Sequence, residues 1–403
     1  MSYRLLPALL TVVLSWLAET DARERVVTDS LTGERLAKAS VFDTRGSLAG
    51  ICTDDGRLPA VSATAYPLTI RYMGYAPATV ERSDTGPVLL RKMEYDLPEI
   101  VVESKKRDML HLIGYVREFS TLTTYSDTVL LFREKTVDFM IPAKRMKKAT
   151  GWTNPRILDS RSFYHFSNSE GTDSVSPSFG AHFSWADWVG LFRNVAIPDS
   201  MRGQDHGTLI IRGRHGPSCI WRRNEEDVTL DVDILAEYDN RKWIPGLAGF
   251  IDNGLDLRRM NMRYIFTDVA GDEIFPGNLA RMSFHIESNG RGRNLSMFFH
   301  PGDPVYVDTY AEIYITDKEY ISAAEARKWE KDPHYDEIRS LQPPSDAPEL
   351  HPSVQAIVDR VNSLDYGALR LDRQPDKRYA GKKDFDKIEK RGFLQSLKSI
   401  LRL

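Results

Sequence analysis

Short β-prone runs separated by turn residues fill residues 25–103 and restrict that stretch to a small all-β fold. Residues 26–27 and 39–42 are two such runs. Between them, residues 29–33 hold the Asp, Ser and Gly that favour a turn, because Asp and Ser can bond their own backbone and Gly adopts positive φ. Residues 54–57 form a second, Asp-Gly turn of the kind that favours a hairpin.

The longest run in this stretch, residues 67–75, alternates between two sets of side chains. One set is Leu68, Ile70 and Tyr72, and the other is Thr69, Arg71 and Met73. A period of two predicts a strand with one buried face. With further candidate strands at 88–90 and 100–102, several short strands with frequent turns predict a β-sandwich.

Four segments of this stretch, in order and at fitting spacing, resemble the carboxypeptidase regulatory-like domain. They are residues 32–41, 53–57, 70–75 and 97–102. This family is a transthyretin-like β-sandwich, common at the front of outer-membrane receptors and secreted proteins of the Bacteroidetes type. The resemblance covers about a fifth of the chain and implies a non-catalytic scaffold or docking role.

The chain departs from those receptors after the resembling stretch. In them, the exit corresponding to residues 97–102 leads into a plug and a large membrane barrel. A barrel of about 22 strands needs many spans of about ten residues each. The roughly 300 residues after the exit are too few, and no plug-like sequence is present. We therefore expect the chain not to be a complete TonB-dependent receptor.

Residues 1–22 have the pattern of an export signal. Arg4 precedes an almost wholly apolar run, residues 5–18, and small residues end at Ala22. The alternative is a membrane anchor, but a spanning helix needs about 20 apolar residues. We expect cleavage after Ala22 and export of the chain to the periplasm or to an outer-membrane-associated location.

Composition excludes some classes of function and of stabilisation. The net charge of −3 argues against a nucleic-acid surface across the whole chain. Only two cysteines occur, Cys52 and Cys219, so a disulfide framework does not hold the fold. A buried free thiol is the simpler interpretation of Cys52, and a Cys52–Cys219 bridge is the alternative in an oxidising compartment.

Residues 109–341 predict a second, larger β-rich domain of no recognised family. The candidate strands are residues 208–212, 219–222, 228–235, 281–287 and 295–299, and residues 128–142 are expected to form a strand pair. Residues 305–315 alternate strictly, which predicts a half-buried antiparallel strand whose Tyr and acidic side chains face away from the core.

Residues 342–403 predict a linker and a basic helical tail. A short helix within 317–332, capped by Asp317, precedes the Pro-rich linker 342–348. A second helix at 352–364 has an apolar stripe. Residues 373–403 hold ten Lys or Arg against four acids, a net charge of +6. Such an amphipathic tail can bind an anionic membrane surface or a partner groove, or pack on its own protein, which we favour.

Catalytic and metal motifs are weak or absent in the sequence. His334 and Glu337 match a His-x-x-Glu zinc spacing, but a third ligand is lacking downstream, and we expect no metal and no cofactor. His206 and His215 flank a predicted strand near Asp205, an arrangement that could support acid–base work but is more typical of ordinary loop histidines.

An aromatic cluster is the best candidate for ligand binding. Its members are Phe179, Phe183, Trp185, Trp188 and Phe192. Aromatic faces stack on sugar rings, and Asp187 could bond hydroxyls, so Trp185, Trp188 and Asp187 are candidate binding residues. The same aromatic side chains could fill a core, which we favour.

The sequence thus predicts a mainly β protein with a transthyretin-like front sandwich, a larger β-rich domain and short C-terminal helices. The expected function is that of an exported, non-enzymatic cell-envelope binding or scaffold protein, with an envelope protein or a glycan as partner. The alternative is a hydrolase of unrecognised type in residues 109–341.

Overall fold

A computed structural model describes most of the chain between residues 25 and 364. The described residues are 25–93, 108–142, 151–177, 184–214, 216–252, 256–291, 299, 302–331, 341 and 343–364. The predicted export signal, the 97–102 exit and the basic tail lie outside them. The chain divides into two compact units, residues 1–361 and 362–403, and all of the described strands lie in the first. Among the described helices, none has the length and apolar character to cross a membrane.

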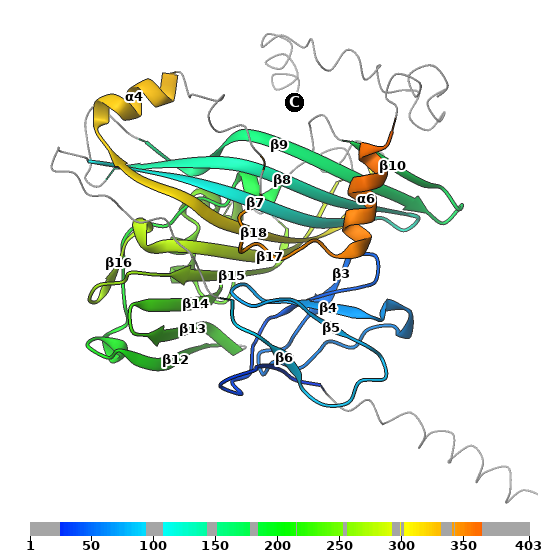
Figure 1. Ribbon diagram of the computed structural model, residues 1–403, viewed down its shortest axis with the longest axis horizontal. Helices are drawn as coiled ribbons and strands as arrows, with labels where there is room; N and C mark the ends of the chain where they lie inside the picture. Colours follow the sequence, from blue (N-terminus) through cyan, green and yellow to red (C-terminus); the bar gives the residue numbers. More distant parts are fainter. Residues whose placement is uncertain are drawn as a thin grey trace, which may run out of the picture. The chain divides into compact units, whose positions relative to one another are not determined.

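The protein is mainly β, as the sequence predicts (Figure 1). The front module, residues 25–93, contains a four-stranded antiparallel sheet in the order β3-β2-β4-β5 and a parallel pair β1-β6. Its elements are β1 Val27–Asp29, β2 Ser40–Phe42, β3 Leu48–Ile51, the 3-10 turn η1 Ala63–Ala65, β4 Leu68–Arg71, β5 Ala78–Val80 and β6 Val88–Leu90.

The front module has its own core and the predicted turns. Val27, Val41, Leu68, Ile70 and Leu90 are among the side chains buried in one cluster. Asp29 Oδ1 accepts hydrogen bonds from the backbone N–H groups of Leu31 and Thr32, at 2.7 and 3.0 Å. Gly56 has a φ of +77° in the Asp-Gly turn, a conformation that favours glycine.

Ten antiparallel strands form one large sheet in the order β10-β9-β8-β7-β18-β17-β15-β14-β13-β12. They are β7 Met109–Thr123, β8 Asp127–Pro142, β9 Trp152–Asn168, β10 Asp173–Pro177, β12 His206–Gly213, β13 Gly216–Asn224, β14 Asp227–Asp233, β15 Leu257–Phe266, β17 Leu279–Arg291 and β18 Pro304–Ile321. β11 Val195–Ala196 and β16 Glu273–Ile274 form a separate antiparallel pair.

Helical elements are short. They are the 3-10 turns η2 Trp185–Asp187, η3 Asp199–Met201, η4 Tyr238–Trp243 and η5 Pro276–Asn278, and the helices α2 Pro245–Asp252, α4 Ala323–Lys331 and α6 Pro352–Asn362. The predicted stripe of α6 is confirmed, because Val354, Ile357, Val358 and Val361 are all buried.

Two element predictions are wrong. Residues 128–142 form the single strand β8 rather than a strand pair, because Arg133, Glu134 and Lys135 at its centre are buried in the sheet beside opposite charges instead of making a turn. Asp317 does not cap a helix, because β18 runs on to Ile321. Ser322 caps α4 instead: its Oγ accepts a hydrogen bond from the Glu325 N–H at 3.2 Å.

The two faces of the large sheet differ in chemistry. We call the side that packs Val116, Leu230, Met262, Phe284 and Ile313 the apolar face; these side chains meet Trp185, Phe192 and Trp243 in one large core cluster. We call the opposite side, which contacts the front module through Tyr72, Met73 and Arg71, the polar face. In Figure 1 the blue front module lies beside the green and yellow strands.

Both predictions of half-buried strands are wrong, because residues on the polar face are buried as well. Tyr310, Glu312 and Tyr314 are as buried as the apolar side of β18. Arg71 and Met73, on the supposedly exposed side of residues 67–75, are buried too. The reason is the same in both cases: the front module and the sheet cover each other's polar side, so the alternating pattern marks two buried faces.

Candidate functional site: a buried ionic interface

A row of mostly alternating charge crosses seven strands of the polar face. Its members are direct cross-strand partners from β9 to β14, in the order Arg161, Glu134, Arg117, Glu312, Ser283, Arg263 and Asp231. Directly opposite residues point to the same side of a sheet, and opposite charges there attract. We call this set the charged row. Ser283 is its one uncharged member.

The front module contributes Arg71 to the row. The Arg71 guanidinium binds Glu312 with two contacts, Nε to Oε1 at 3.2 Å and Nη2 to Oε2 at 2.5 Å. Arg71 is 5% exposed and Glu312 is 2% exposed. The hydroxyls of Tyr310 and Tyr314 donate to the same carboxylate at 3.0 and 3.1 Å. Four contacts therefore converge on one buried carboxylate, as a desolvated charge requires.

The ionisation of this cluster follows from its contacts. Burial opposes the charge on Glu312, but Arg71, Arg117 and the Tyr310 hydroxyl together outweigh burial and hold the pKa of Glu312 below its usual range. Burial, together with the Glu312 charge, raises the pKa values of the Tyr310 and Tyr314 hydroxyls well above the ordinary value for tyrosine. The cluster is thus a carboxylate, a guanidinium and two neutral phenols, an arrangement suited to holding two segments together.

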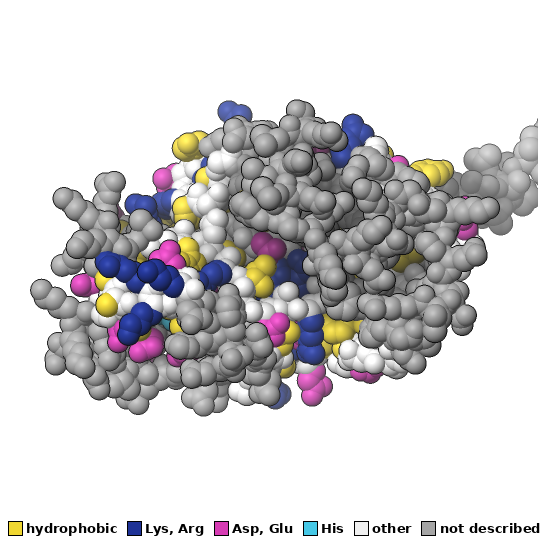
Figure 2. Space-filling model, turned by 90° about the horizontal axis from the view of Figure 1, so that it is seen from above, with side chains coloured by type: hydrophobic (Ala, Val, Ile, Leu, Met, Phe, Trp, Pro, Cys, Tyr) yellow, Lys and Arg dark blue, Asp and Glu magenta, His cyan; other side chains and the backbone are white. Residues whose placement is uncertain are grey.

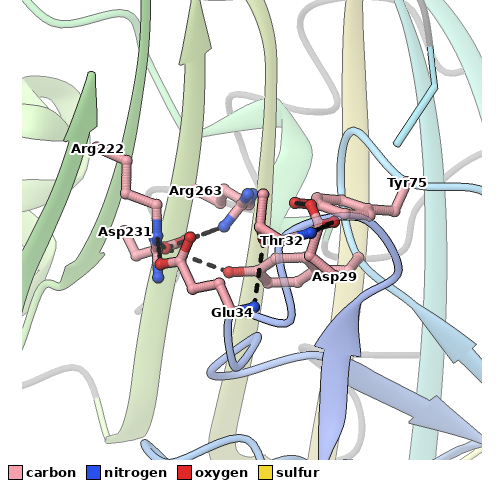
Figure 3. A network of polar contacts seen from close by, with 8 residues as sticks. Asp29, Thr32, Glu34, Tyr75, Arg222, Asp231 and Arg263 are labelled. Atoms are coloured by element: carbon pink, nitrogen blue, oxygen red, sulfur yellow. Dashed lines mark hydrogen bonds and ion pairs between the residues drawn. The ribbon is translucent and has the colours of Figure 1, made fainter. Parts of the chain in front are cut away.

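A second ionic cluster lies at the β14 end of the row (Figure 3). Asp231 accepts from Arg263 Nη1 at 2.9 Å and from Arg222 Nη1 at 2.6 Å, and Arg222 Nε reaches Glu34 of the front module at 2.6 Å. The Arg263 guanidinium lies 3.7 Å from the centroid of the Tyr72 ring. Its Nε donates to the Met73 carbonyl oxygen at 3.2 Å.

A narrow cleft of about 50 Å³ lies between the two ionic clusters. Its walls include Ser40 and Arg71 from the front module, and Asn261, Ser283 and His285 from the sheet. That volume holds a few water molecules. In the arrangement described, the interface serves to join two parts of the chain.

The predicted aromatic site is distributed between the core and the surface. Trp185 and Phe192 lie in the large core cluster, as expected if these aromatic side chains fill a core. Trp188 is 36% exposed. Asp187 Oδ1 accepts from the Nζ of Lys135, which is 1% exposed, so this carboxylate neutralises a buried lysine. Phe179 and Phe183 lie outside the described residues.

Of the remaining candidates, the structure describes His206 and the two cysteines. His206 is exposed, and its Nδ1 lies 3.0 Å from Asn224 Oδ1. His215, His334 and Glu337 lie outside the described residues. Cys52 and Cys219 are free, buried thiols in separate core clusters, so the cross-domain bridge is wrong.

Sequence reasoning missed the residues of the interface, although a signal was present. Arg71 stands between Ile70 and Tyr72, and Glu312 stands between Ala311 and Ile313. A single charge at the centre of an alternating strand is ordinary on a solvent-facing side. The shared buried face could have been inferred only by pairing the strand that holds Arg71 with the strand that holds Glu312. These two residues are 241 positions apart in the sequence.

Charge on the outside of the molecule is mixed. Seen from above, the described surface carries Lys and Arg side chains with Asp and Glu among them (Figure 2). The exposed Arg202–Asp199 and Lys242–Asp239 pairs are examples of this mixing.

Comparisons with known proteins leave the family open. No protein-family model matches the chain, and no curated protein matches it. Among solved structures, one of lipid–protein interactions in lipovitellin is similar at a TM-score of 0.24 and 10% identity. The match covers 53% of this chain and 26% of that chain, and a likeness this low supports no conclusion.

Proposed function

We propose that this chain is an exported, non-enzymatic binding or scaffold protein of the cell envelope, in which the front module is fastened to the large sheet. The observation that carries the proposal is the buried Arg71–Glu312 pair. Its partners belong to the two parts that the sequence separates. Removing either member leaves the other charge buried and unpaired, which is strongly destabilising. The pair therefore favours one arrangement of the front module on the sheet.

The chemistry of the interface supports a holding role over a reactive one. Each carboxylate at its centre is bound by guanidinium groups, and Glu312 is kept ionised by Arg71. General acid–base catalysis requires a pKa near the working pH and access to substrate. Arg71 and Glu312 are instead buried, and the pKa of Glu312 is held below its usual range.

The partner we propose is an envelope protein or a glycan, and the basic tail is a second contact, to an anionic membrane surface. The test uses the full mature chain, purified and incubated with detergent-solubilised envelope protein, isolated envelope glycan and anionic vesicles. Saturable binding to the envelope protein or glycan is expected. In parallel, peptide, ester and glycan substrates should show no turnover.

A matched pair of variants links binding to the interface. Glu312→Gln removes the buried charge on β18, and Glu319→Gln changes an exposed glutamate on the same strand. If the fastened arrangement forms the binding surface, Glu312→Gln weakens binding and Glu319→Gln does not. Turnover of any substrate at enzymatic rates, or no binding to any envelope fraction, would contradict the proposal.

A further inference from the structure

Three potential metal ligands meet on the polar face, beside the cleft. His285 and Glu287 are two residues apart on β17 and so share a side of the sheet. Asp308 on β18 is the direct cross-strand partner of Glu287. One ligand atom from each of the three lies within 4.8 Å of the others.

The charges at this place are unbalanced. Two carboxylates directly opposite each other on neighbouring strands repel. Glu287 Oε1 accepts from Arg259 Nη1 at 2.6 Å, which supplies one positive charge for the two acids. With His285 neutral, as a metal ligand must be, a cation would balance the second carboxylate.

His285 is buried, and its Nε2 faces the carboxylate of Asp308. The residue is 4% exposed, and its Nε2 lies 2.5 Å from Asp308 Oδ1. Its Nδ1 has no hydrogen-bond partner among the described residues. If a cation sits between Nε2 and the carboxylates, the ring proton resides on Nδ1, as in metal-bound histidines whose other nitrogen is a donor. His285 also lines the cleft.

The donor set selects the kind of cation. Imidazole nitrogen suits Zn²⁺ and other late transition metals, whereas Mg²⁺ and Ca²⁺ take oxygen ligands. Ligands about 2.0–2.1 Å from Zn²⁺ in a tetrahedron lie roughly 3.3 Å apart, so the His285–Asp308 contact must open by about 0.8 Å. Glu287, with 18% of its side chain exposed, faces the route from solvent.

We propose that His285, Glu287 and Asp308 together bind one divalent transition-metal cation, and we take Zn²⁺ as the representative ion. Three protein ligands leave one position for water. The cation would bridge β17 and β18 next to Tyr310, whose ring contacts Phe42 of the front module at 5.6 Å between centroids. Tyr310 also donates a hydrogen bond to Glu312, so the proposed metal site adjoins the Arg71–Glu312 contact. The inference stands independently of the proposed function.

The test uses the full mature chain without a histidine tag, stripped with EDTA and titrated with Zn²⁺ by calorimetry. We expect one equivalent to bind and the thermal unfolding temperature to rise. Asp308→Asn and Glu287→Gln each remove the charge of one ligand carboxylate and should weaken binding at least 10-fold, because even the loss of an outer-shell partner of a ligand costs 10-fold to 100-fold. Mg²⁺ should bind at least 10-fold more weakly than Zn²⁺.

Exposed residues elsewhere supply the controls. His206→Gln and Glu273→Gln change a histidine and a glutamate on other strands, and both variants should bind Zn²⁺ as the parent does. If Asp308→Asn fails to fold, Glu287→Gln at its more exposed position still decides the matter. The proposal is overturned if the parent shows no saturable Zn²⁺ binding, if Glu287→Gln retains parental affinity, or if Mg²⁺ binds as tightly.

Discussion

The apolar and polar faces of the large sheet both contain fully buried side chains, but different interactions hold those side chains in place. On the apolar face, Leu230, Met262 and Phe284 are excluded from water by other hydrocarbon. On the polar face, Glu312 is paired with Arg71 of the front module, and Asp231 is paired with Arg222 and Arg263. Burial of apolar area favours compaction without specifying partners. A buried carboxylate must meet a particular donor, so the polar face specifies which part of the chain covers it.

The two faces contribute to the stability of the fold in different ways. The apolar face supplies most of the folding free energy, at about 25 cal/mol per Å² of apolar surface removed from water. Buried ion pairs are a weaker source of net stability, because desolvation offsets their attraction. Removing one member is nevertheless costly, since the other remains buried and unpaired. The two faces should therefore respond differently to single and to paired substitutions.

The largest single effect is expected on the apolar face. Phe284→Ala removes a fully buried ring from the centre of the large core cluster and leaves a cavity. We expect the free energy of unfolding to fall by about 4 kcal/mol, measured by urea denaturation. A loss below about 1 kcal/mol would show that this face is loosely packed.

Glu312→Gln should cost nearly as much, for an electrostatic reason. The substitution keeps the shape of the side chain but leaves the Arg71 charge buried without a counter-ion. We expect a loss of about 3 kcal/mol in the free energy of unfolding. Glu319→Gln, at an exposed position of the same strand, should change it by less than about 0.5 kcal/mol. Equal effects of the two variants would remove the distinction between the faces.

Acid should weaken the polar face selectively. The pKa of Glu312 is lowered in the folded protein, so its contribution to stability is complete above the unfolded pKa of about 4.3 and is lost as pH falls through the folded pKa. The parent should therefore lose stability on acidification below about pH 4.3. Glu312→Gln should show a smaller slope there, whereas Phe284→Ala should keep the parental slope. An unchanged slope in Glu312→Gln would contradict the assigned ion pair.

The smallest expected effect concerns the reactivity of the two thiols, Cys52 and Cys219, which shows whether the core clusters open. Burial raises the pKa of Cys52 to about 12 and, as the largest cause, that of Cys219 to about 11. At pH 8 both are protonated and shielded, so a thiol reagent should label neither in the native protein within minutes. In denaturant it should label both. Rapid labelling of Cys52 in the native state would mean that the front module opens.

Part of this architecture can be predicted from sequence. The alternation of residues 305–315 and the apolar stripe of residues 352–364 indicate a strand and a helix because local periodicity reports one buried side. Periodicity cannot report a second buried side whose residues are polar. Arg71 and Glu312 therefore looked solvent-facing, and residues 128–142 looked like two strands rather than one. Their partners are distant in sequence, and only tertiary structure brings the charges together.

The most direct test of the account is a double-mutant cycle on Arg71 and Glu312. Arg71→Met, Glu312→Gln and the double variant are unfolded in urea beside the parent, and the coupling free energy is taken from the four values. If the pair fastens the front module to the sheet, the double variant should be more stable than the sum of the single losses implies, by about 2 kcal/mol. Additive losses, within about 0.5 kcal/mol, would show that the two residues do not interact and would contradict the account.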